Sequence, residues 1–182
     1  MRKLVLVLAP LALLLASVQL ACAQRQSPHE KTSATVAGAT ITVEYGRPYL
    51  KGRKMLGGHE PYGKVWRTGA DEATTFTTDK DLMFGSLHVP AGTYALFTIP
   101  GENEWTVILN KVAKTWGAFD YEKNKAQDLG RIKVPVEKLS SPVEQLTISV
   151  EPKGGYEGAL KIVWETTSIS VPLTVHLDTP AR

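Results

Sequence analysis

Cysteine is nearly absent from this chain. Cys22 is the only one among 182 residues, and it lies in an N-terminal stretch that we expect to be cleaved. Without it the mature chain has no cysteine. A structural disulfide, a thiolate metal site and a cysteine nucleophile are therefore excluded.

Long hydrophobic runs are also missing, apart from one at residues 4–18 that follows Arg2 and Lys3. Ala21 and Ala23 follow this charged start and apolar centre. They are the small residues that signal peptidase needs at positions −3 and −1 relative to the cleavage site. We therefore predict that residues 1–23 are a signal peptide. The mature chain would then begin at residue 24.

The apolar run is short for a transmembrane helix, and no other stretch approaches that length. We expect an exported protein, periplasmic or extracellular, with no transmembrane span after cleavage. Gln19 stands three residues before Cys22, where a lipoprotein signal has a branched aliphatic residue. This disfavours a lipid anchor on Cys22.

A charge excess is lacking too. The chain has 21 Lys and Arg against 18 Asp and Glu, and the predicted cleavage removes Arg2 and Lys3, which leaves a net charge of about +1. Nucleic-acid-binding domains carry a strong basic excess. We therefore expect no nucleic-acid partner.

No segment of ten or more residues shows a sustained helical period. Ile41, Val43 and Tyr45 instead alternate with polar residues, as in a half-buried strand. Similar segments separated by Gly and Pro predict an all-β fold, a sandwich or open barrel of about nine short, mostly antiparallel strands. The predicted strands lie at residues 41–45, 73–78, 82–89, 93–99, 105–109, 131–136, 146–151, 159–165 and 168–175. The boundaries that follow are a polar lead-in at 24–32, one β domain at 33–177 and a tail at 178–182.

Familiar catalytic and metal motifs are missing as well. The segment 58–65 resembles a phosphate-binding loop but ends in Val65, where a hydroxyl residue is required. His59 and Glu60 begin like a zincin helix, but Gly63 replaces the second histidine. No Gly-x-Ser-x-Gly elbow occurs. We expect no metal and no cofactor.

Two segments, 46–67 and 112–130, do not follow the strand pattern. Long irregular segments in a compact domain are usually functional or disordered, and aromatic residues argue against disorder here. Their cationic and aromatic residues form the candidate binding set, and no catalytic residue is assigned. The set is Arg47, Lys51, Arg53, His59, Tyr62, Trp66, Arg67, Glu72, Trp116 and Tyr121.

Arg67 is the centre of this set, because Trp66 should draw it toward the core. A charge there needs a partner. We expect Glu72 to face it, with Arg47 in reach and Asp71 pointing to the opposite side. The structural pair is the favoured interpretation, but the guanidinium could also serve a ligand, since its planar fork suits carboxylates, sulfates and phosphates.

Several strings of this sequence resemble the signature of one family. They are Tyr45-Gly46-Arg47-Pro48, Lys51-Gly52-Arg53, residues 61–70, Glu72-Ala73-Thr74, residues 90–100, Glu104-Trp105-Thr106 and Trp116-Gly117. The chain resembles the DUF2911 family over about residues 27–175, with Asp71 in place of an asparagine. This resemblance implies an exported bacterial protein with a compact β fold, and it implies no activity.

Three hypotheses remain open from the sequence. The first is a non-catalytic binding or envelope-accessory domain, with a cationic and aromatic pocket for a small anionic or glycan-like ligand. The second is a hydrolase of envelope polymers or glycans that uses Glu72 or Asp120 with His59. The third is a structural module that docks on another envelope protein by a strand edge.

Overall fold

Alternation of apolar and polar residues becomes alternation of buried and exposed side chains in the structure. In the second strand, Ile41, Val43 and Tyr45 are buried, while Thr40 and Glu44 are exposed. The structure, a computed structural model, describes residues 27–175. Within that range it is nearly all β, and its one α-helix has only four residues.

The described residues form ten strands in two sheets, and neighbouring strands in each sheet run antiparallel. One sheet has six strands in the order β1-β2-β3-β6-β7-β8, and the other has four in the order β5-β4-β10-β9. The strands are β1 His29–Val36, β2 Ala39–Gly46, β3 Ala70–Thr78, β4 Leu82–Phe84, β5 Leu87–Val89, β6 Gly92–Ile99, β7 Glu104–Asn110, β8 Asp128–Pro135, β9 Glu137–Gly154 and β10 Glu157–Val175.

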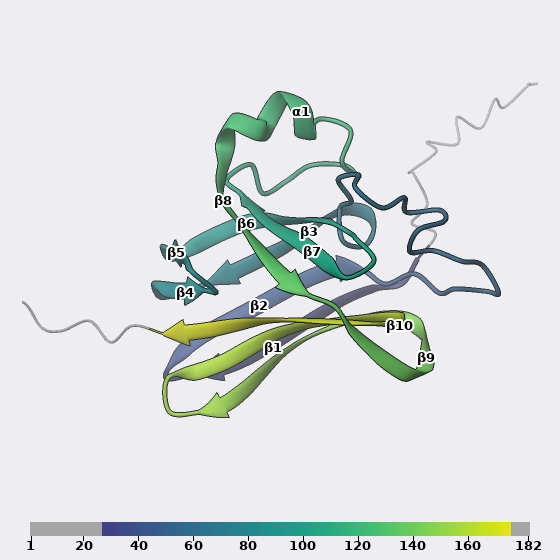
Figure 1. Ribbon diagram of the computed structural model, residues 1–182. Helices are drawn as coiled ribbons and strands as arrows, with labels where there is room; N and C mark the ends of the chain where they lie inside the picture. Colours follow the sequence, from purple (N-terminus) through teal and green to yellow (C-terminus); the bar gives the residue numbers. More distant parts are fainter. Residues whose placement is uncertain (1–26, 176–182) are drawn as a thin grey trace, which may run out of the picture.

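The two sheets enclose one main core (Figure 1). Aromatic residues from both sheets meet there. Trp66 stacks on Trp164 with ring centroids 5.6 Å apart and meets Trp105 edge-on at 6.1 Å. Phe76 and Phe84 make a second edge-to-face pair across the core. The predicted all-β, sandwich-like fold is confirmed.

The strands differ from the prediction in length, in number and in how the chain is divided. Strand β1 is absent from the nine predicted strands, and it begins at His29, inside the predicted polar lead-in. The predicted strand 82–89 is two strands, because Gly85 turns the chain with a left-handed φ of +59°. The predicted strands 159–165 and 168–175 are one strand, β10, of 19 residues, whose register shifts near Glu165 against the 18 residues of β9.

The predicted irregular segment 46–67 is ordered, although it contains no strand. Met55 and Leu56 are buried, and both donate their backbone N–H groups to the carboxylate of Glu165. Trp66 exchanges two backbone hydrogen bonds with Thr98 of β6. These contacts hold the segment, the dark-blue loops at the right of Figure 1, against the ends of the sheets.

The second irregular segment carries the helical residues. Helix α1, Tyr121–Asn124, and the 3-10 turn η1, Lys125–Gln127, lead into β8. The predicted signal peptide and the tail lie outside the described residues. Within the described part of the chain, no helix is long and apolar enough to cross a membrane.

Candidate functional site

A pocket of about 390 Å³ opens between the 46–67 segment, the start of β3 and the middle of β10. Four of its residues are basic, so we name it the basic pocket. Its lining is Ser27, Pro48, Tyr49, Lys51, Arg53, Met55, His59, Glu60, Arg67, Gly69, Ala70, Asp71 and Trp164. Its volume falls within the range of small-molecule sites, about 300–1,000 Å³.

Close backbone contact shapes one wall of this pocket. A Cβ added to Gly46 would lie 2.1 Å from the carbonyl oxygen of Ala70, so only glycine fits where β2 meets β3. Thr68 and Asp71 on either side of this contact have left-handed φ values of 59° and 63°. Thr74 Oγ1 donates to the Thr68 carbonyl at 2.9 Å and holds the turn. The turn brings Arg67 and Asp71 to the same pocket.

Arg67 is the central cation of the basic pocket. Its Nε is buried and has no hydrogen-bond partner. No ion pair of Arg67 occurs within residues 27–175. A buried donor without an acceptor costs about 1–3 kcal/mol, so such groups in native proteins call for an explanation.

Trp164 contributes a second buried donor. Its side chain is only 1% exposed and lines the pocket, and its indole Nε1 also has no hydrogen-bond partner. Its stacking partner Trp66, by contrast, donates Nε1 to the Gly69 carbonyl at 3.1 Å. The basic pocket therefore has two residues with unsatisfied buried N–H groups.

Two carboxylates balance part of the positive charge. The pKa of Glu60 is raised, chiefly because burial disfavours the charged carboxylate, while the guanidinium of Arg67 partly lowers it. Asp71 lies 3.3 Å from Nε2 of His29. The pocket thus offers hydrogen-bond acceptors as well as cations.

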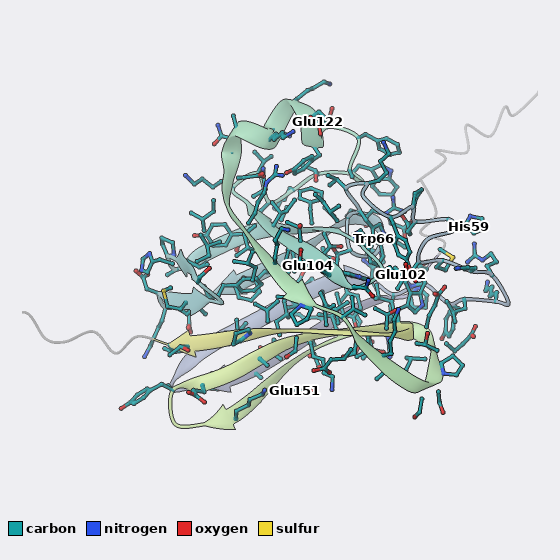
Figure 2. The ribbon with its side chains drawn as sticks, in the orientation of Figure 1. His59, Trp66, Glu102, Glu104, Glu122 and Glu151 are labelled. Carbon is teal, nitrogen blue, oxygen red and sulfur yellow. The ribbon has the colours of Figure 1, made fainter. Side chains whose placement is uncertain are left out.

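Lys51, Arg53 and His59 complete the basic lining (Figure 2 shows His59 in the loops at the edge of the molecule). Arg53 is oriented by its own segment, because it donates Nε to the Leu50 carbonyl and Nη2 to the Tyr49 carbonyl. All three basic side chains come from exposed positions. Lys51 and Arg53 add positive charge at the rim, and the half-buried Arg67 lies deeper.

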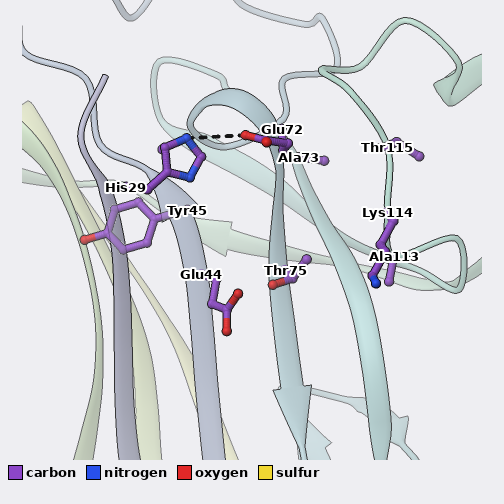
Figure 3. A pocket seen from close by; sticks show the side chains of 10 residues that line it. His29, Glu44, Tyr45, Glu72, Ala73, Thr75, Ala113, Lys114 and Thr115 are labelled. Atoms are coloured by element: carbon purple, nitrogen blue, oxygen red, sulfur yellow. Dashed lines mark ion pairs between the residues drawn. The ribbon is translucent and has the colours of Figure 1, made fainter. Parts of the chain in front are cut away.

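A second pocket of about 380 Å³, here the outer pocket, lies against β1, β2 and β3 (Figure 3). Its charged or titratable residues are His29, Glu44, Tyr45, Glu72 and Lys114. His29 Nε2 lies 3.3 Å from Glu72 Oε2 as well as from Asp71 Oδ2. This imidazole therefore links a carboxylate of the outer pocket to one of the basic pocket.

The predicted pair of Arg67 and Glu72 is wrong. Glu72 lines the outer pocket and contacts His29, whereas Asp71, predicted to point away, shares the basic pocket with Arg67. The prediction assumed regular alternation at the start of β3. The left-handed φ of Asp71 and the irregular β2–β3 register there break that alternation.

Five further candidate residues lie outside the basic pocket lining. The Arg47 guanidinium is held by Glu30 at 2.6 Å and by the Leu146 carbonyl at 2.9 Å. Trp66 is a core residue, and Tyr62 is exposed beside Gly57. Trp116 is exposed, and Tyr121 is buried at the far end of its loop.

Tyr121 has a structural environment of its own. Its hydroxyl donates to Asp128 Oδ2 at 2.7 Å and accepts from Arg131 Nη2 at 2.6 Å. Burial, followed by the bond to Asp128, raises the pKa of this phenol. Phe97 packs edge-on against its ring. These contacts anchor α1 and do not reach the basic pocket.

The residues named for a hydrolase do not converge. His59 lines the basic pocket and Glu72 the outer pocket. Asp120 accepts a hydrogen bond from Lys123 at 2.8 Å. Among the described residues, no group of three or more His, Cys, Asp or Glu side chains is arranged to hold a metal ion.

A family model described as "Protein of unknown function (DUF2911)" matches residues 27–173, which is most of the chain. The chain belongs to the DUF2911 family. No curated protein matches this chain significantly, and neither does any solved structure. The resemblance noted in the sequence is thus confirmed for this DUF2911 domain.

Sequence reasoning missed several residues of the DUF2911 basic pocket. Glu60 was noted only within a rejected motif, Asp71 was predicted to point away from Arg67, and Tyr49 and Trp164 were not singled out. For Trp164 no local signal exists, since the strand pattern places it only in a buried position. Glu60 had one usable signal, because it is a carboxylate inside the dense basic segment 46–67.

Proposed function

We propose that this DUF2911 domain is an exported binding domain that takes a small anionic ligand in the basic pocket. The observation that supports this best is the state of Arg67. Its Nε is buried without an acceptor, in a pocket that also contains Lys51, Arg53 and His59. A ligand oxyanion would supply the missing acceptor.

The energetics favour such a ligand. Hydrogen bonds from a guanidinium to a carboxylate or another oxyanion are charge-assisted and worth about 1.5–3 kcal/mol. Part of the desolvation cost of Arg67 is already met when the protein folds, so less is lost on binding. Binding sites of this kind commonly hold charges that do not stabilise the unliganded fold.

The direct test is anion binding by the mature protein and by two variants. Isothermal titration with sulfate, phosphate, acetate and citrate should detect binding of at least one anion by the wild type. Arg67→Gln should weaken that binding about tenfold or more, because it removes a charge-assisted pair. Its unfolding free energy should be unchanged or higher, because no ion pair is lost.

Lys153→Gln is the matched control, since Lys153 is an exposed cation near the end of β9 and lies outside the pocket lining. It should bind anions like the wild type. Equal affinities in the Arg67→Gln and Lys153→Gln variants would contradict the proposal. A loss of several kcal/mol of stability in Arg67→Gln would instead show that this guanidinium holds the fold together.

A further inference from the structure

We infer that the ligand of the basic pocket is an acidic saccharide, a sugar unit that carries a carboxylate and several hydroxyl groups. This inference rests on the proposed function and narrows its ligand class. It follows from the hydrogen-bond donors, the hydrogen-bond acceptors and the aromatic side chains that surround Arg67.

The two carboxylates of the pocket are the first argument. Glu60 and Asp71 line the same cavity as Arg67. A compact polyanion such as phosphate would place several negative oxygens near both of them, and like charges in a partly buried site repel strongly. Hydroxyl groups, in contrast, can donate to these two carboxylates while a single ligand carboxylate accepts from Arg67.

The donors fit the same ligand. Arg67 Nε and Trp164 Nε1 are both buried without an acceptor. A carboxylate has two oxygens and can accept from more than one donor at a time. Sugar hydroxyls can also accept, so the indole N–H could be satisfied by either group.

Aromatic side chains near the pocket also favour a saccharide ligand. Tyr49 lines the pocket and is 39% exposed, and Phe119 is 80% exposed. Phe119 lies close to Arg67, since a Cβ added to Gly117 would be 3.0 Å from the Phe119 ring and 3.7 Å from Arg67 Nη1. Exposed aromatic rings beside a pocket offer flat apolar faces against which a ligand can pack.

The loop that carries Phe119 is tied to the pocket wall. Gly117 donates its backbone N–H to the Asp71 carbonyl at 3.0 Å, and Ala73 donates to the Thr115 carbonyl at 3.0 Å. The exposed Trp116 pairs with Glu72 in the same ladder. The aromatic loop is therefore positioned beside Arg67 by backbone bonds, and the apolar faces of a sugar ring could pack against it.

The experiment compares three kinds of probe on the mature protein by isothermal titration. The probes are oligomers of glucuronic and galacturonic acid, the corresponding neutral oligomers of glucose and galactose, and the simple anions acetate and sulfate. The acidic oligomers should bind at least tenfold more tightly than acetate and the neutral oligomers. Arg67→Gln should remove that preference.

Phe119→Ala tests the aromatic contribution separately. It should weaken binding of the acidic oligomers about three- to tenfold, and it should leave binding of the simple anions unchanged. Tyr156→Ala is the control, because Tyr156 is another exposed aromatic residue (49%), in the turn between β9 and β10 and outside the lining of the basic pocket. It should not change the affinity for any probe.

The outcomes separate this inference from the proposed function. If simple anions bind through Arg67 but acidic oligomers bind no better than acetate, the saccharide class is wrong and anion binding stands. Equal binding of neutral and acidic oligomers also overturns the inference. If no probe binds, both the inference and the proposed function fail. Tight binding of sulfate above all other probes would assign the pocket to an inorganic or sulfated anion instead.

Discussion

Glu60 and Arg67 face the same pocket, and neither is neutralised by a close partner within the described residues. Burial raises the pKa of Glu60 above the ordinary value of 4.5, and Arg67 lowers it only in part. His59, Lys51, Arg53 and Asp71 line the same cavity. Burial of the Glu60 carboxylate therefore carries a desolvation cost that its attraction to Arg67 offsets only in part.

A pH dependence of stability follows from Glu60. Since its pKa is higher in the folded state, the folded protein holds more proton on this group at pH values just above 4.5. Its contribution to stability is present below that value and is lost as the pH rises through the folded pKa. Urea unfolding between pH 4 and pH 8 measures this slope. Glu60→Gln should flatten it and be more stable than the wild type at the alkaline end.

Glu122→Gln is the control for this measurement, because Glu122 is a well-exposed carboxylate of α1. Its pH profile should follow the wild type. If the Glu60→Gln profile also follows the wild type, then burial of Glu60 has no consequence for stability.

At the scale of elements, the close contact of β2 and β3 forms the pocket wall. Gly46 is the last residue of β2 and lies directly against Ala70. A Cβ added to Gly69 would lie 2.8 Å from the carbonyl oxygen of Gly46. Both Gly69 and Ala70 line the basic pocket. Any side chain at residue 46 would push β2 and β3 apart and displace Gly69 and Ala70, which form this wall of the pocket.

We therefore expect Gly46→Ala to destabilise the protein by about 3 kcal/mol, at the upper end of the cost of overpacking. It should weaken anion binding as well, because Arg67 lines the same pocket as Gly69 and Ala70, which Gly46 contacts. Gly155→Ala provides the comparison. Gly155 has a left-handed φ of 56° but open space around it, so only about 1 kcal/mol of backbone strain is expected. Denaturant unfolding of both variants measures the difference, and equal losses would contradict the steric explanation.

For the whole molecule, the start of the mature chain and the basic pocket are close in sequence. The predicted first residue is Gln24, and Ser27 already lines the pocket. A retained signal peptide would leave a long apolar extension joined to the chain at this point. The predicted cleavage site therefore lies within a few residues of the pocket lining in the sequence.

Expression with the native signal in a bacterial host should yield an exported protein whose mass corresponds to residues 24–182. Intact-mass measurement and N-terminal sequencing of the purified protein decide this. The expectation follows from Ala21 and Ala23 at the −3 and −1 positions. A lipid-modified Cys22 at the new N-terminus would contradict both the cleavage site and the soluble exported form.

The amino-acid sequence alone determined the fold class and the family. Alternation with a period of two is a local property, so Ile41, Val43 and Tyr45 already predicted a strand with one buried face. The strands at 93–99 and 105–109, which pair as β6 and β7, were predicted for the same reason. The segment 46–67, which carries most of the basic pocket, was identified because it lacks this alternation and is dense in cations and aromatics.

Only the tertiary structure decided which side chains share a pocket. Trp164 lies 97 positions after Arg67 in the chain, and the pairing of β10 within its sheet brings it to the same cavity. Asp71, and not Glu72, shares the basic pocket with Arg67 because Asp71 has a left-handed φ. Neighbouring residues in the sequence could not reveal either fact, because burial and hydrogen-bond satisfaction depend on contacts between elements distant along the chain.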